Sequence, residues 1–172
     1  MKTYYISWYG PYRMENIYEN DFGDNEKLYS NVLYMIAGKE RYQRGPDEIK
    51  YIGITTNGVY YRFKNHHKAI NVTRDFQVWI GCLDKSLVNK KDLELVESVL
   101  IYFTQTSLNE KKTIKPPKIS CTVISRYYNK YYEVYKNQKS YLTMLPDVLM
   151  WRKEENKLFY ASKLARSHFI IP

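Results

Sequence analysis

The chain has 172 residues, of which 44% are hydrophobic, and it carries a formal net charge of +9 at pH 7. This hydrophobic content suffices for a packed core and excludes a chain that is disordered throughout, and the length fits one domain with extensions. The charge favours a polyanion such as nucleic acid as partner, or reflects a codon bias that over-uses Lys and Tyr. Its 19 tyrosines suit contacts with bases and phosphates, or half-buried positions in a sheet.

Targeting signals and cysteine usage indicate the cellular compartment that the chain suits. No run approaches the ~18 apolar residues of a membrane span, and the N-terminal segment has no signal-peptide pattern, so we expect an intracellular protein without a membrane partner. Cys82 and Cys121 each stand alone in an apolar run. We interpret both as reduced core residues and not as metal ligands or a disulfide pair.

The N-terminal half begins with a segment of poor periodicity, residues 1–30, which we interpret as an arm with a candidate strand at 3–8. Two further strands are predicted at 31–38 and 49–55. The charged loop between them contains Gly45-Pro46, so the simplest pairing is an antiparallel hairpin.

A helix is predicted over residues 59–70, after the Asn57-Gly58 turn. Val59, Phe63 and Ile70 fall on one apolar face of that helix. Arg62 and His66 are four residues apart and therefore share a face that flanks the apolar one.

A third strand at 75–83 precedes an amphipathic helix at 93–105, in which apolar residues recur at steps of three and four. On a helical wheel Glu97 falls toward the apolar face. An ionised carboxylate there is costly unless it is paired or binds a metal, which makes Glu97 a candidate functional residue.

The C-terminal part opens with a basic loop at 111–118 that Pro116-Pro117 keeps irregular. A strand at 119–125 follows, then a segment dense in Tyr and Lys, and finally a hairpin within 149–162. The predicted fold class is α+β, a small central antiparallel sheet flanked by helices, with N- and C-terminal extensions.

With these residues on these elements, the chain resembles the GIY-YIG nuclease family over residues 31–109. The residues that match its motifs are Tyr34, the Tyr51-Ile52-Gly53 tripeptide, Arg62, His66, Glu97 and the Leu108-Asn109 pair. Two features depart from the family pattern. Val32 and Leu33 stand where the family has Gly and Ile, and the connection between the first two strands is longer than usual.

The resemblance implies hydrolysis of DNA phosphodiester bonds with Mg²⁺ or Mn²⁺. Glu97 would hold the metal ion and Arg62 would stabilise the transition state. Tyr51 would orient or deprotonate the attacking water, and Tyr34 would hydrogen-bond within the same cluster. His66 would position the phosphate or relay a proton.

Further residues would support this site. Gly53 would allow close approach of backbone or phosphate, and Asn109 would hold the end of the second helix against the sheet. We expect phosphate contacts from basic residues in and around the core and its C-terminal extension, namely Lys64, Lys111, Lys112, Lys115 and Arg126.

We therefore expect one nuclease domain over 1–172, with its catalytic core at 31–109, an arm at 1–30 and a DNA-contacting extension at 110–172. A compact form of this kind is typical of a restriction or phage-encoded enzyme, cytoplasmic in a bacterial or phage-infected cell. Its partner would be double-stranded DNA, and a homodimer would allow both strands to be cut. The alternatives are an inactive nucleic-acid-binding module on the same scaffold and a basic RNA-associated protein.

Overall fold

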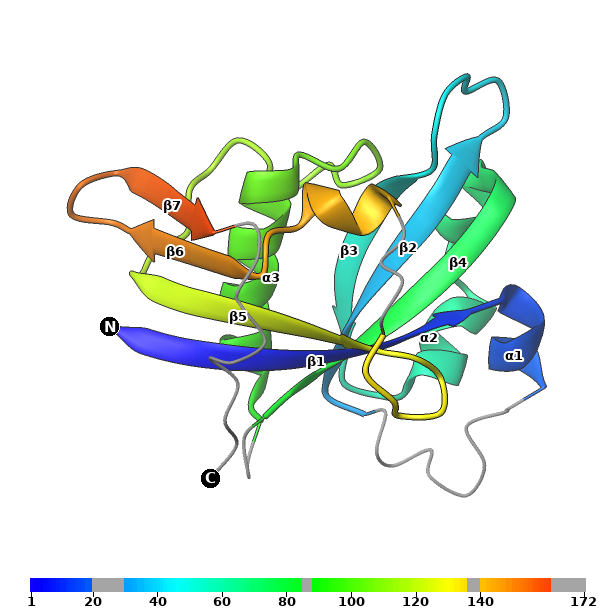
Figure 1. Cartoon of the computed structure of the whole chain (residues 1–172), viewed down its shortest axis with the longest axis horizontal. Coiled ribbons are helices and arrows are strands. Elements are labelled where there is room, and N and C mark those ends of the chain that lie inside the picture. The colour runs from blue at the N-terminus through cyan, green and yellow to red at the C-terminus, as the bar shows by residue number, and fades with distance from the viewer. Residues whose placement is uncertain (20–29, 85–87, 136–139, 162–172) are drawn as a thin grey trace.

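The architecture is a single seven-stranded sheet with helices on both faces (Figure 1). The computed structural model describes residues 1–19, 30–84, 88–135 and 140–161. The strand order is β3-β2-β4-β1-β5-β6-β7. The strands are β1 (Lys2–Tyr12), β2 (Val32–Glu40), β3 (Glu48–Thr55), β4 (Val72–Leu83), β5 (Cys121–Tyr128), β6 (Val148–Arg152) and β7 (Lys157–Ala161).

The α+β class is confirmed, but the sheet is larger than predicted and mixed. Strands β1 and β5 run parallel, and the other neighbours pair antiparallel. The predicted small antiparallel sheet was wrong because the segments interpreted as extensions add their own strands to it. Among the described residues no helix is long and apolar enough to cross a membrane.

The N-terminal segment is the main correction. Instead of an arm, β1 lies between β4 and β5, and its Ile6 and Trp8 side chains are buried. In β1 the inward residues alternate with Tyr5, Ser7 and Tyr9. Because tyrosine is partly apolar, the alternation of apolar and polar residues along β1 is weak in the sequence. In the structure, however, buried side chains alternate with less buried ones along the strand.

Strands β2 and β3 form the predicted antiparallel hairpin, with Tyr34 opposite Gly53 and Ile36 opposite Tyr51. Side chains of β2 alternate between two cores. Leu33 packs in a core with helix α3 (Lys90–Thr104), whereas Tyr34 packs in a second core on the other face of the sheet.

The second core contains residues of helix α2 (Val59–Lys64), which is shorter than the predicted helix over 59–70. Val59 and Phe63 are buried as expected, but Ile70 is 74% exposed. The helix ends because the ring of His66 accepts the backbone N–H of Ala69 and turns the chain, a side-chain bond that competes with helix continuation. The remaining helical elements are α1 (Met14–Tyr18) and the 3₁₀ turns η2 (Ala69–Asn71) and η3 (Ser140–Met144).

The C-terminal half follows the prediction more closely. Helix α3 and the strand β5 form where expected, and β6 and β7 form the terminal hairpin. The indole N–H of Trp151 on β6 donates to the carbonyl of Pro117 at 2.9 Å, which fixes one end of the basic loop 111–118. Cys121 is buried, as expected for a core residue, and Cys82 is half-buried; both are free thiols.

Candidate functional site

Tyr34 is the centre of a polar cluster inside an otherwise apolar core. Its side chain is fully buried, and its hydroxyl accepts a hydrogen bond from Nε of Arg62 at 2.8 Å. Nε2 of His66 lies 2.9 Å from the same hydroxyl. Helix α2 and the residues directly after it thus place Arg62 and His66 against the hydroxyl of Tyr34 on β2.

The protonation of His66 follows from its partners. Burial, followed by the charge of Arg62, lowers the pKa of His66 to about 4, so the ring is neutral at pH 7. Its Nδ1 accepts the N–H of Ala69 at 3.1 Å, which leaves the single ring proton on Nε2. His66 therefore donates to Tyr34. Because both ring nitrogens have protein partners, its geometry favours orientation of Tyr34 over the phosphate contact that we predicted.

Tyr51 lies beside this pair at the surface of the cluster. The rings of Tyr34 and Tyr51 stack with their centroids 5.9 Å apart, and Tyr51 is half-buried. Burial and then the Tyr51 phenol raise the pKa of Tyr34. Burial acts to lower the pKa of Arg62, but the Tyr34 and Tyr51 phenols raise it above its usual range. Tyr51 is therefore electrostatically coupled to Arg62.

Gly53 makes this tyrosine pair possible. A Cβ atom at position 53 would lie 2.6 Å from the hydroxyl oxygen of Tyr34 and 2.7 Å from Cε1 of Tyr51. The sequence predicted that Gly53 admits backbone or phosphate. In the structure its missing side chain admits the two phenol rings instead.

Glu97 lies on helix α3, which packs against the end strand β3 on the face of the sheet opposite to Tyr34. Glu97 is buried, as its wheel position predicted, with 9% of its surface exposed. Burial raises the pKa of its carboxyl group, and the ion-paired ammonium of Lys112 opposes that shift. The positive charge of Arg62 also acts to lower the pKa of Glu97, less strongly than Lys112 does.

Asn109, which follows the end of α3, bonds to the backbone of the sheet. Its amide makes two hydrogen bonds to the backbone of Ile52 on β3, accepting from the N–H at 2.9 Å and donating to the C=O at 2.8 Å. The N–H of Leu108 donates to the carbonyl of Lys50 at 3.0 Å. The segment after α3 is therefore fixed to the strand that carries Tyr51 and Gly53.

A divalent cation at this site would have the Glu97 carboxylate as its protein ligand and would keep most of its waters. Glu97 is a buried carboxylate on an apolar helix face, and the described residues contain no cluster of three or more His, Cys, Asp or Glu that would form an all-protein cage. Mg²⁺ is commonly held by one or two carboxylates and several waters. Glu97 is the residue that would hold it.

The basic residues predicted to contact phosphate are scattered. Lys64, Lys111 and Lys115 are exposed. Lys112 instead pairs with Glu97, a contact that the sequence prediction missed because nothing in the basic loop distinguishes it from its neighbours. Arg126 lies on β5, from which three other strands separate β3, so the structure does not bring it to the cluster.

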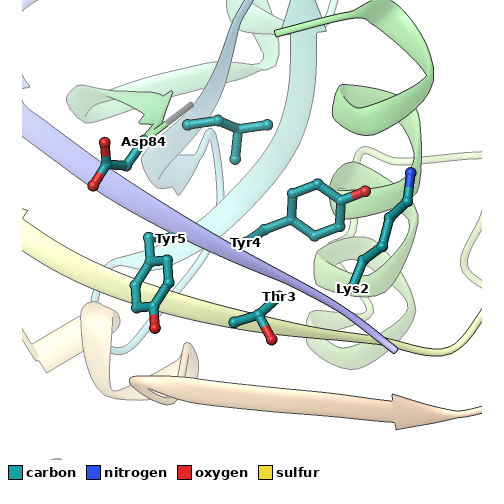
Figure 2. A pocket seen from close by; sticks show the side chains of 6 residues that line it. Lys2, Thr3, Tyr4, Tyr5 and Asp84 are labelled. Atoms are coloured by element: carbon teal, nitrogen blue, oxygen red, sulfur yellow. The ribbon is translucent and has the colours of Figure 1, made fainter. Parts of the chain in front are cut away.

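A separate hollow of about 280 Å³ lies at the start of β1 and the end of β4 (Figure 2). Figure 2 shows Lys2 and Tyr4 directed toward α3, where Tyr4 donates to the buried carboxylate of Asp92 at 2.6 Å and Lys2 forms an ion pair with it. These contacts fasten β1 to the start of α3. The hollow contains none of the residues of the Tyr34 cluster.

The chain matches no protein-family model, no curated protein and no solved structure. The fold defines it as an α+β protein. Its candidate site consists of buried Tyr34 and His66, the exposed Arg62 that donates to Tyr34, and the buried Glu97 on α3.

Proposed function

We propose that this chain is a metal-dependent DNA endonuclease of the GIY-YIG type. The observation that carries the proposal is the contact of the buried Tyr34 with Arg62 and with Tyr51, three residues that lie apart in the sequence. Arg62 also acts as a positive charge on the buried carboxyl group of Glu97. Burying the Tyr34 phenol, the His66 ring and the Glu97 carboxyl group costs free energy that apolar side chains at these positions would not cost. Perturbed ionisable groups gathered in this way are typical of catalytic sites.

Arg62 is suited to bind the scissile phosphate. Its Nε is held by Tyr34, while the residue as a whole is exposed. Its two terminal nitrogens can then donate to non-bridging oxygens and stabilise the charge that grows on them in the transition state. His66 and Tyr34 fix the direction of the guanidinium.

Tyr51 is the phenol of the cluster that solvent reaches, so it can orient an attacking water or accept its proton. Arg62 compensates the negative charge that would develop on the phenol oxygen. A divalent cation held by Glu97 would supply Lewis-acid stabilisation of the leaving oxygen. Exposed Lys64, Lys111 and Lys115 and the net charge of +9 support duplex DNA as the substrate.

A cleavage assay on supercoiled plasmid tests the proposal. We expect nicking or linearisation with Mg²⁺ or Mn²⁺, none with EDTA, and a loss of roughly 10²–10³ in rate for Glu97→Gln and for Arg62→Ala. Glu94→Gln is the matched control, because Glu94 lies on the same helix but is exposed. Cation-independent cleavage, or full activity of Glu97→Gln, would refute the assigned roles.

One observation favours the alternative of an inactive nucleic-acid-binding module: Lys112 occupies the carboxylate that the cation would need. DNA binding without cleavage under every cation tested would support that alternative. A restriction or phage-related role and a homodimer, which would let one site cut each strand, belong to the same proposal.

A further inference from the structure

The Glu97–Lys112 ion pair is the contact at the site that catalysis does not explain. Nζ of Lys112 binds Oε2 of Glu97 and lies 3.5 Å from the carbonyl oxygen of Glu94. The Glu97 side chain is 11% exposed and that of Lys112 is 34% exposed. The lysine therefore enters from the solvent side and covers a carboxylate that is otherwise enclosed by protein.

The loop around Lys112 is built to hold this position. Lys112 has a left-handed backbone, with φ of 69°. Nε2 of Gln105 donates to the carbonyls of Tyr102 and Thr113, at 2.6 and 2.7 Å, which ties the loop to the end of α3 directly after Lys112. Together with the bond from Trp151 to Pro117, these contacts fix the loop on both sides of its midpoint.

An ammonium group and a divalent cation cannot bind the same carboxylate oxygen at once. The charges that act on the Glu97 carboxyl include Arg62, Lys112 and the carboxylate of Glu94. If a cation replaces the lysine, the carboxylate stays neutralised, and the ammonium is released at the surface of the proposed site. There it can bind a phosphate, which was the role that the sequence predicted for it.

We propose that Lys112 is a positioning residue that holds Glu97 in the cation-free protein and that a divalent cation must displace. This inference rests on the proposed function. The apparent cation affinity is then the intrinsic affinity multiplied by the fraction of molecules in which Lys112 does not occupy the carboxylate. Removing the ammonium tightens cation binding, and keeping a positive charge at position 112 does not.

The test is calorimetric titration of the DNA-free protein with Mn²⁺, which needs no catalytic turnover. We expect Lys112→Met to bind Mn²⁺ roughly tenfold more tightly than the wild type. Lys112→Arg keeps a cation on Glu97 and should bind as the wild type does. Lys111→Met is the matched control, because Lys111 is the exposed neighbour in the same loop. Adding Glu97→Gln to Lys112→Met should abolish the tight binding.

The outcomes separate the two proposals. Equal Mn²⁺ affinity of Lys112→Met and the wild type overturns the role of Lys112 and leaves the nuclease proposal intact. An equal gain in Mn²⁺ affinity for Lys111→Met also overturns the role of Lys112, because the gain would then follow from the loss of one positive charge anywhere in the loop. If neither the wild type nor Lys112→Met binds Mn²⁺, the inference and the metal-dependent function both fail.

Discussion

At the scale of single residues, the site depends on a histidine that does not titrate in the usual range. His66 is 6% exposed and serves as a fixed donor to Tyr34, whose hydroxyl also accepts from Arg62. With two donors on its oxygen, Tyr34 must direct its own proton elsewhere in the cluster. The ring of Tyr51 is its stacked neighbour. A protonated His66 would still donate to Tyr34, but its Nδ1 would lose the bond from Ala69.

The lowered pKa of His66 predicts a pH dependence of stability. As pH falls from about 6.5 toward about 4, the unfolded chain binds a proton at His66 that the folded chain does not. Stability is therefore full above this window and declines within it, by roughly 1–2 kcal/mol after allowance for solvent screening. Urea unfolding at a series of pH values measures this decline.

The variant His66→Gln keeps a side-chain donor for Tyr34 and removes the titration. Its unfolding free energy should fall less than that of the wild type across the window. His67→Gln is the matched control, since His67 is the exposed neighbour. Parallel pH profiles for His66→Gln and the wild type would contradict the assignment of a buried neutral ring.

At the scale of elements, the pairing of the chain after α3 with β3 decides where Glu97 lies relative to Tyr51. Asn109 satisfies both backbone groups of Ile52, as a neighbouring strand would. Its amide is partly buried, so both bonds are shielded in part from water.

The substitution Asn109→Ala should lower the free energy of unfolding by about 1–3 kcal/mol, because it leaves a donor and an acceptor of β3 without their partner. Cleavage should fall as well, since Glu97 loses its fixed position relative to Tyr51. Chemical denaturation gives the first quantity and the plasmid assay the second. Ser107→Ala, in the same connection but bonded to the exposed part of Glu40, should change little. An unchanged stability for Asn109→Ala would show that the two bonds contribute nothing net.

The elements differ in how far the sequence could define them. Helix α3 was predictable because its apolar residues recur at steps of three and four. The β2–β3 hairpin was predictable because two short apolar runs flank a charged loop that contains Gly45-Pro46. The end of α2 was not, because it is set by a bond from Ala69 to a histidine ring that no periodicity reveals. The buried position of Glu97 followed from its place on the wheel, whereas its partner Lys112 depends on loop geometry.

At the scale of the whole molecule, the segment 31–109 is not a separate unit. Strand β4 pairs with β2 along one edge and with β1 along the other, and β1 lies outside that segment. Trp8 on β1 is fully buried, and its ring would lie 2.6 Å from a Cβ atom at Gly81 on β4. The sheet and the core on its α3 face thus include strands that precede residues 31–109 and strands that follow them.

We therefore expect residues 31–109 expressed alone to fail to fold cooperatively. Without β1, the β4 backbone and the apolar surface around Trp79 are exposed to water. Circular dichroism during thermal unfolding, compared with the full chain, measures the loss. A sharp transition in the fragment would restore the view of a self-contained core with two accessory extensions.

The bonds of the segment after α3 also restrict how two copies of the chain could associate. An end strand with open backbone groups invites another strand to add to it. On β3, the carbonyl of Lys50 and both backbone groups of Ile52 are already bonded to Leu108 and Asn109. A continuous sheet through two β3 strands would have to break these bonds beside Tyr51. A dimer of the proposed nuclease is therefore expected to form through another surface, which would leave the β3 side open to the proposed substrate.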